Sequence, residues 1–271
     1  MLPEVDSDRE VKLCCSTFYQ SDIVRMLLGD VFHPGGLELT GHLGETMGLG
    51  AGQRVLDVAC GRGVSAVYLA EHFGAHVSGV DYGPENVAAA EAHAAARGVS
   101  HLTEFRQADA EDLPFPRDSF DAVISECSFC TFPSQEGAAR SMARVLRSGG
   151  RLGLTDMTVD GPLPEDIRSL LAWVACLGGA GPAESYVSKL EEAGFTNFVV
   201  EDQRNALLDM VVGVRRKLLG AELAVGLGKL DLGKLDLGEF DLGEVKGLAR
   251  NAGAHIESGL IGYTLIVADN G

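Results

Sequence analysis

Cysteine is the residue type with the widest chemical scope in this sequence, and it occurs at Cys14, Cys15, Cys60, Cys127, Cys130 and Cys176. A thiolate is a nucleophile and a ligand for soft metal and metalloid ions, whereas a buried thiol packs as a small apolar group. Two of the cysteines fall in the run ISECSFCTF (124–132), which holds a single acidic residue. Because the chain is long and its N-terminus does not resemble a signal peptide, we expect thiols, catalysis or metalloid binding rather than a disulfide framework.

Carboxylates at the ends of predicted strands form a second chemical set. In VLDVACGRG, an apolar strand with Asp57 runs into a tight turn that contains Gly61 and Gly63. Small residues there let a ligand approach the backbone, and the next helix begins with unpaired N–H groups. Asp81 follows about twenty residues later in GVDYGPENV, where a carboxylate suits the hydroxyls of a ribose. Asp109 closes a third strand in QADAEDLPF and is placed to face an adenine amino group.

The elements that position these groups follow from the apolar pattern. Short apolar runs predict strands at 54–59, 75–81, 101–109, 120–126 and 151–157, with helices between them at 64–73, 84–97 and 136–147. Strands that alternate with helices of this length indicate βαβ units, a parallel sheet and right-handed crossovers. The ligand is then expected across the carboxyl ends of the strands.

The pattern loosens after residue 157. We predict helices at 165–178, 183–195 and 204–226, and two further strands at 196–202 and 261–269. A five-residue repeat (LGKLD, LGKLD, LGEFD, LGE; 227–244) has neither a helical nor a strand period, and we interpret it as a turn-rich loop. The prediction is therefore an α/β fold, a doubly wound seven-stranded Rossmann-like sheet with an N-terminal segment and a helical insertion between the last two strands.

Composition narrows the classes of function. The formal charge of −17 repels phosphate backbones, so a nucleic-acid partner is not expected. No apolar run is long enough to predict a membrane span. The polar, acidic start MLPEVDSDRE favours a cytoplasmic location.

The motifs LDVACGRG, GVDYGPENV, ADAEDLPF and RVLRSGGRLGLTD resemble the motif series of class I S-adenosylmethionine-dependent methyltransferases, over about residues 50–157. A dinucleotide oxidoreductase fits these segments less well. The resemblance implies S-adenosylmethionine as the cofactor. It implies a cap segment at 1–50, a Rossmann-like core at 51–157 and a substrate-side cover at 158–271. The implied cofactor contacts are Tyr19, Asp57, Ala59, Gly61, Gly63, Asp81, Tyr82, Asp109, Ala110 and Glu126. Ala59 stands where the family has glycine.

The cysteines also resemble those of the arsenite methyltransferase family, in which thiolates from three separate segments bind As(III). Cys127 (in SECSF) and Cys176 (in CLGGA) match two of these positions. Cys14 and Cys15 are candidates for the third, and the resemblance implies catalytic roles for these four, with Cys127, Cys176 and Cys15 as As(III) ligands. They precede Tyr19, whereas the family's cysteine follows its tyrosine. Glutathione or thioredoxin is the implied thiol donor.

Three alternatives remain open at this point. In a methyltransferase of an organic small molecule, such as a quinone, a sterol or a secondary metabolite, the cysteines would line the pocket, and Glu126 or His33 would be the nearest general base. A metalloid-binding protein without turnover would retain the cofactor fold. A redox role for Cys14 with Cys15, or for Cys127 with Cys130, is the third alternative.

Overall fold

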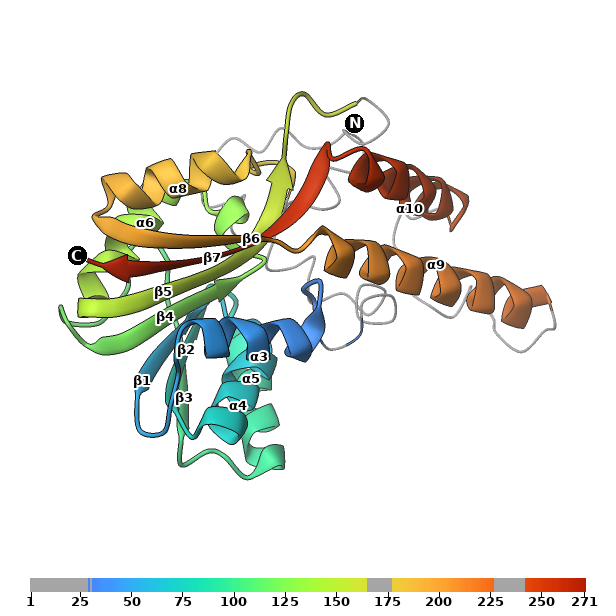
Figure 1. Cartoon of the computed structure of the whole chain (residues 1–271). Coiled ribbons are helices and arrows are strands. Elements are labelled where there is room, and N and C mark those ends of the chain that lie inside the picture. The colour runs from blue at the N-terminus through green and yellow to red at the C-terminus, as the bar shows by residue number, and fades with distance from the viewer. Residues whose placement is uncertain (1–28, 30, 165–176, 227–241) are drawn as a thin grey trace.

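The computed structural model describes residues 29, 31–164, 177–226 and 242–271 (Figure 1). Strands from this part of the chain form a seven-stranded sheet in the order β3-β2-β1-β4-β5-β7-β6. The predicted fold class is therefore confirmed. No described helix is long and apolar enough to cross a membrane.

The half of the sheet that contains β1 to β5 is parallel. Its strands are β1 (Arg54–Val58), β2 (His76–Asp81), β3 (Thr103–Gln107), β4 (Phe120–Glu126) and β5 (Leu146–Val159). The accompanying helices are α3 (Gly36–Thr46), α4 (Val64–Phe73), α5 (Pro84–Arg97), the short η1 (Phe129–Thr131) and α6 (Gln135–Val145). Four of the five residues of β1 are buried, as expected for a parallel strand that helices cover on both faces.

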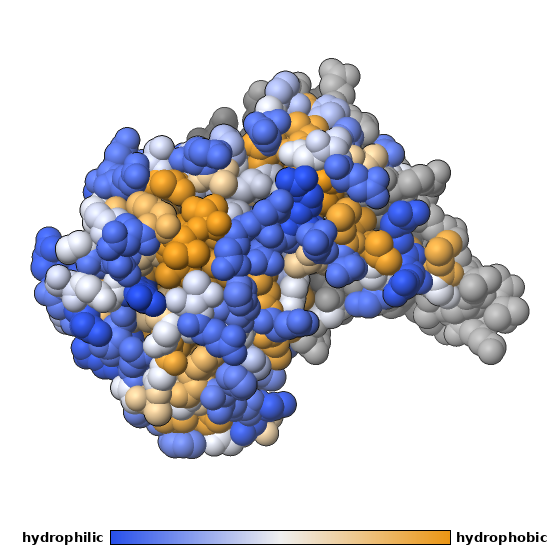
Figure 2. Space-filling model, viewed as in Figure 1, coloured by the Kyte–Doolittle hydropathy of each residue, from blue (hydrophilic) through white to orange (hydrophobic). Residues whose placement is uncertain are grey.

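The other half contains α8 (Ala183–Glu192), β6 (Phe195–Asp202), α9 (Arg204–Gly226), α10 (Leu242–Glu257) and β7 (Ile261–Asn270). β7 is inserted antiparallel between β5 and β6. The helices α9 and α10 pack against each other and project from one end of the sheet (Figure 1). Val199 and Val200 of β6 and Leu219 of α9 are exposed apolar residues of this half. Figure 2 shows apolar patches between the polar residues on one face of the molecule.

The sheet order places a crevice beside β1. From β1, the chain adds β2 and β3 on one side and β4 and β5 on the other. The connections therefore leave in opposite directions at the carboxyl ends of β1 and β4, and in open α/β sheets this point is where ligands bind.

Most predicted elements agree with the structure to within a few residues, and two predictions are wrong in part. α6 ends at Val145 rather than 147, because Leu146 already pairs with Phe120 at the start of a longer β5. Residues 242–244, which we predicted to be in a loop, begin α10. The predicted helix at 165–178 and the rest of the repeat lie almost entirely outside the described residues.

Candidate functional site

A cavity of about 170 Å³ opens at the carboxyl ends of β1, β2 and β4. Residues from the turns after β1, β2 and β3 form one side, which we call the turn wall (57–65, 80–86 and 108–110). Residues 31–33 and 126–132 form the other side, which we call the cap wall. The residues that the sequence predicted and that line this cavity are Asp57, Ala59, Gly61, Asp81, Tyr82, Asp109, Ala110, Glu126 and Cys127.

The turn after β1 brings the backbone close to the cavity. Ala59 and Gly61 both have positive φ (60° and 52°), so the chain bends sharply between β1 and α4. Gly63 has φ 71° and lies outside the cavity lining; a Cβ there would be 2.7 Å from Cβ of Ala90 and 3.0 Å from the Phe105 ring. Gly63 therefore allows close packing of α4, α5 and β3, which fixes the turn.

Asp81 is the most strongly hydrogen-bonded acid of the site. Its carboxylate accepts the N–H groups of Gly61 and Gly83, both at 2.9 Å, and the side-chain amide of Asn86 at 3.0 Å. Burial raises the pKa of Asp81, and these three donors oppose that change. Asp81 therefore ties the two turns together at the place where the sequence predicted ribose binding.

Asp57 is a buried acid with unused hydrogen-bonding capacity. Its side chain lies at the end of β1, only 3% exposed, and its Oδ2 has no hydrogen-bond partner among the described residues. Burial raises the pKa of Asp57 well above its ordinary value, and the nearby Glu126 and Asp81 raise it further. An unpaired buried oxygen in a ligand cavity is unfavourable unless a ligand donor or cation completes it.

Asp109 and Cys60 complete the turn wall. A carboxylate oxygen of Asp109 accepts the N–H of Glu111 at 3.0 Å, which holds the turn after β3 against the cavity. Cys60 donates its N–H to Val80 at 2.9 Å. Burial, followed by the charges of Asp57 and Asp81, raises the pKa of the Cys60 thiol, so this thiol stays protonated and packs.

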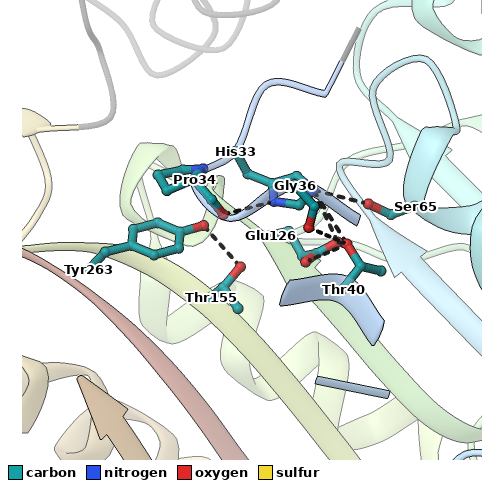
Figure 3. A network of polar contacts seen from close by, with 8 residues as sticks. All are labelled: His33, Pro34, Gly36, Thr40, Ser65, Glu126, Thr155 and Tyr263. Atoms are coloured by element: carbon teal, nitrogen blue, oxygen red, sulfur yellow. Dashed lines mark hydrogen bonds and ion pairs between the residues drawn. The ribbon is translucent and has the colours of Figure 1, made fainter. Parts of the chain in front are cut away.

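Glu126 joins the cap wall to the helices around it (Figure 3). The Thr40 hydroxyl of α3 lies 3.1 Å from both carboxylate oxygens of Glu126. The Nε2 atom of His33 lies 3.6 Å from Glu126 Oε2 and 3.4 Å from the Ser65 hydroxyl of α4. The side chains of His33 and Glu126 are only 8% and 4% exposed. This cluster fastens the segment before α3 over the cavity.

The two thiols of ISECSFCTF lie in different places. Cys127 lines the cavity and has a positive φ of 52°, while its N–H donates to Thr155 O at 2.6 Å. The Thr155 hydroxyl in turn accepts the Tyr263 hydroxyl at 3.0 Å (Figure 3). Cys130 is 1% exposed within the core, and its N–H donates to the Asp156 carboxylate at 2.9 Å.

Four predicted site residues, Cys14, Cys15, Tyr19 and Cys176, lie outside the described residues. The turn that follows Cys176 is described, and the side-chain amide of Gln135 links it to Cys130 by donating to Gly179 O at 2.8 Å and to Cys130 O at 3.4 Å. Sequence reasoning missed Thr40, Ser65 and Asn86. Asn86 follows Asp81 closely in GVDYGPENV, whereas no local pattern indicates Thr40 or Ser65.

The acidic lining of the cavity suits a cationic ligand such as S-adenosylmethionine. The close turn of Ala59 and Gly61 leaves the backbone open to the cavity, and Asp81 and Asp109, which the sequence predicted as contacts of ribose and adenine, both line it. The unpaired Oδ2 of Asp57 can accept the ammonium group of the methionine part. These features define an α/β protein of the Rossmann-like class with a site for a cationic nucleoside.

Comparison with known proteins identifies the family. The family described as "Methyltransferase domain" matches residues 56–154. O-methyltransferase resE of Aspergillus sclerotiorum is 30% identical over 192 residues, which cover 69% of this chain and 72% of the relative. The chain therefore belongs to the class I S-adenosylmethionine-dependent methyltransferases, and S-adenosylmethionine is its cofactor.

Other relatives differ in their substrates and are covered less fully. Methyltransferase GfsG of Streptomyces halstedii is 35% identical over 59% of this chain and 58% of the relative. Arsenite methyltransferase of Halobacterium salinarum is 32% identical over 53% of this chain, but only 37% of the relative is covered. The solved structure of the [4+2]-cyclase SpnF has a TM-score of 0.77 with 22% identity and covers 99% of this chain and 97% of its own; this likeness concerns the fold.

Proposed function

We propose that this chain transfers the methyl group of S-adenosylmethionine to a small-molecule acceptor. The observation that carries the proposal is the cavity itself, in which Asp57, Asp81 and Asp109 end successive strands around a turn of positive φ. When bound, the cofactor supplies an electrophilic methyl group. The contribution of the chain is to bind and orient the two reactants, and orientation can provide a large part of the rate.

The two walls divide this task. The turn wall holds the nucleoside, because its acids and backbone are preorganised by their own hydrogen bonds. The rest of the cap wall, with His33 and Cys127, is left to face the acceptor and to exclude water. Fixed polar groups in a site of this kind cost no reorganisation during the reaction.

Methyl-labelled cofactor tests this function. The purified full chain is offered four acceptors in separate reactions: arsenite with glutathione, phosphoethanolamine, sarcosine and a phenol. We expect label in one product and an equal amount of S-adenosylhomocysteine. Absence of cofactor binding in isothermal titration calorimetry would contradict the proposal.

More specifically, we propose that the methyl acceptor is a trivalent metalloid such as arsenite, held by cysteine thiolates. Cys127 supports this proposal, because it lies at the cavity directly after β4. As(III) is thiophilic, and thiolates are the ligands that soft ions select. The proposed additional ligands are Cys176 and either Cys14 or Cys15, with glutathione or thioredoxin delivering the metalloid.

Serine variants test the metalloid acceptor. Cys127→Ser and Cys176→Ser should each abolish arsenite methylation, because a bound As(III) would lose one of its thiolates, while cofactor affinity changes less than about twofold. Cys130→Ser is the matched control, since this thiol is buried in the core and lies outside the cavity lining. Full arsenite methylation in both variants overturns the metalloid proposal and leaves methyl transfer standing.

A second acceptor class, an organic molecule with a hydroxyl or amine group, has one specific observation in its favour. The imidazole of His33 and the carboxylate of Glu126 lie 3.6 Å apart, and both line the cavity. Such a pair can accept the proton that a hydroxyl or amine loses on methylation. Loss of methyl transfer to phenol or sarcosine in His33→Gln, with arsenite methylation unchanged, would select this class.

A further inference from the structure

The cavity carries more negative charge than its own donors neutralise. Asp57, Asp81, Asp109 and Glu126 all line it, and Arg62 is the sole lysine or arginine among the described residues that does. Three of the acids accept backbone N–H groups: Asp57 that of Ala66, Asp81 those of Gly61 and Gly83, and Asp109 that of Glu111. Glu126 is different, because its partners are the Thr40 hydroxyl and the His33 ring.

Asp57 and Glu126 are the two under-compensated acids, and they are close enough to interact. The charge of Glu126 is the largest cause, after burial, of the raised pKa of Asp57. A single hydroxyl, that of Thr40, is shared by both oxygens of Glu126, and Oδ2 of Asp57 has no partner among the described residues. Two buried carboxylates repel each other more strongly than two carboxylates in water, because the local dielectric constant is lower.

The methyl donor and its product differ by one charge. S-adenosylmethionine carries an ammonium, a carboxylate and a sulfonium, whereas S-adenosylhomocysteine has lost the sulfonium charge. Asp81 and Asp109 are placed for the ribose and adenine that both molecules share, so these acids cannot distinguish them. The methionine part is left for the ends of β1 and β4, where Asp57 and Glu126 lie.

We propose that Glu126, with Asp57, makes this site select the cationic methyl donor over the neutral product. The ammonium and the carboxylate of either ligand cancel in net charge, so S-adenosylhomocysteine brings no net charge to the two acids. Only the sulfonium of S-adenosylmethionine adds a positive charge that offsets one of them. Loss of that charge on methyl transfer leaves the pair under-compensated again, which favours release of the product. This inference rests on the proposed function, since it concerns the same cofactor site.

Titration calorimetry with three ligands tests the proposal without any acceptor. The ligands are S-adenosylmethionine, S-adenosylhomocysteine and sinefungin, which carries an amine cation in place of the sulfonium. The wild-type chain should bind both cationic ligands about tenfold more tightly than S-adenosylhomocysteine. This ratio corresponds to a difference in binding free energy of about 1.4 kcal/mol. In Glu126→Gln this preference should fall to about twofold or less, with the affinity for S-adenosylhomocysteine equal or higher.

Two control variants separate charge from structure. Asp109→Asn should weaken all three ligands by the same factor, because adenine is common to them. Glu104→Gln removes an exposed charge from β3, outside this cavity, and should leave the preference unchanged although the net charge changes by the same amount. The first control shows whether binding of every ligand is weakened alike. The second shows whether the net charge of the protein, rather than the position of Glu126, causes the preference.

Each result supports or overturns the inference. Equal binding of the three ligands by the wild-type chain overturns it even if Glu126→Gln does not fold. Equal weakening of all three ligands by Glu126→Gln also overturns it and assigns Glu126 a structural role through Thr40 and His33. If none of the three ligands binds, the proposed methyltransferase function itself is overturned.

Discussion

The two walls of the cavity are built by different means. In the turn wall, Asp81 bonds to Gly83 and Asn86, two and five residues away, and to Gly61, 20 residues away, while Asp109 bonds to Glu111, two residues away. The cap wall depends on longer separations, because Glu126 meets Thr40 across 86 residues and His33 meets Ser65 of the turn wall across 32 residues. Local bonds can be encoded in a short motif, whereas the cap wall exists only once distant elements have packed. The first wall can therefore remain constant while the second changes with the acceptor.

The largest expected effect is a loss of stability when a larger side chain disrupts the packing of the turn wall. Gly63→Val places a branched side chain at φ 71° and a Cβ 2.7 Å from that of Ala90. Strain and overpacking together should lower the free energy of unfolding by about 3–5 kcal/mol. Chemical denaturation measures this loss, and Gly98→Ala, also at positive φ but with open space around it, is the matched control. Equal losses in the two variants would contradict the packing role of Gly63.

The next effect tests the same wall through its ligand. Asp81→Ala removes the acceptor of three donors and the predicted partner of the ribose. Because hydrogen bonds to a charged group contribute about 1.5–3 kcal/mol each, cofactor affinity should fall roughly 100-fold. Titration calorimetry measures it, with Asp112→Ala as the comparison outside the cavity lining. Unchanged affinity in Asp81→Ala would place the nucleoside elsewhere.

A smaller effect separates the two thiols near the cap wall. Cys130→Ser puts a hydroxyl into the core at a 1% exposed position and should cost about 2 kcal/mol of unfolding free energy. Cys127→Ser, at the cavity, should cost less than about 0.5 kcal/mol. Thermal or chemical unfolding of both variants measures this difference. A reversed order would mean that Cys127, not Cys130, belongs to the packed core.

The smallest effect is a gain in stability at the junction of the walls. The pKa of Asp57 is raised on folding, so the folded state binds its proton more tightly, and ionisation of Asp57 destabilises the fold. Without cofactor, Asp57→Asn should therefore be about 1 kcal/mol more stable at neutral pH. The difference should shrink as the pH falls toward about 4, the ordinary pKa of aspartate.

Unfolding at several pH values measures this dependence. The same variant should bind S-adenosylmethionine more weakly, since the charge that destabilises the empty site attracts the ligand. Loss of stability in Asp57→Asn at neutral pH would mean that its carboxylate is compensated within the fold.

The difference between local and long-range contacts also explains which parts of the fold and site could be predicted from the sequence. The parallel half of the sheet was predictable, because β1 and β4 are apolar runs and α4 and α5 are bounded by glycine turns. The turn wall was predictable because its acids follow strands at regular spacing. The cluster of His33, Thr40 and Ser65 was not, since it depends on how α3 and α4 meet the end of β4. The early start of β5 was missed because Leu146 pairs with Phe120, a long-range contact.

The position of β7 determines when the sheet can be completed during synthesis of the chain. β7 is the last strand in chain order, yet it lies between β5 and β6. About a hundred residues separate the ends of β5 and β7, and at ribosomal speeds of about 5–20 residues per second that stretch takes roughly 5–20 s to synthesise. The elements of the turn wall are all synthesised before β5 ends. During this time β5 lacks the strand that covers its edge in the finished sheet, and an unpaired strand edge is a place where chains aggregate.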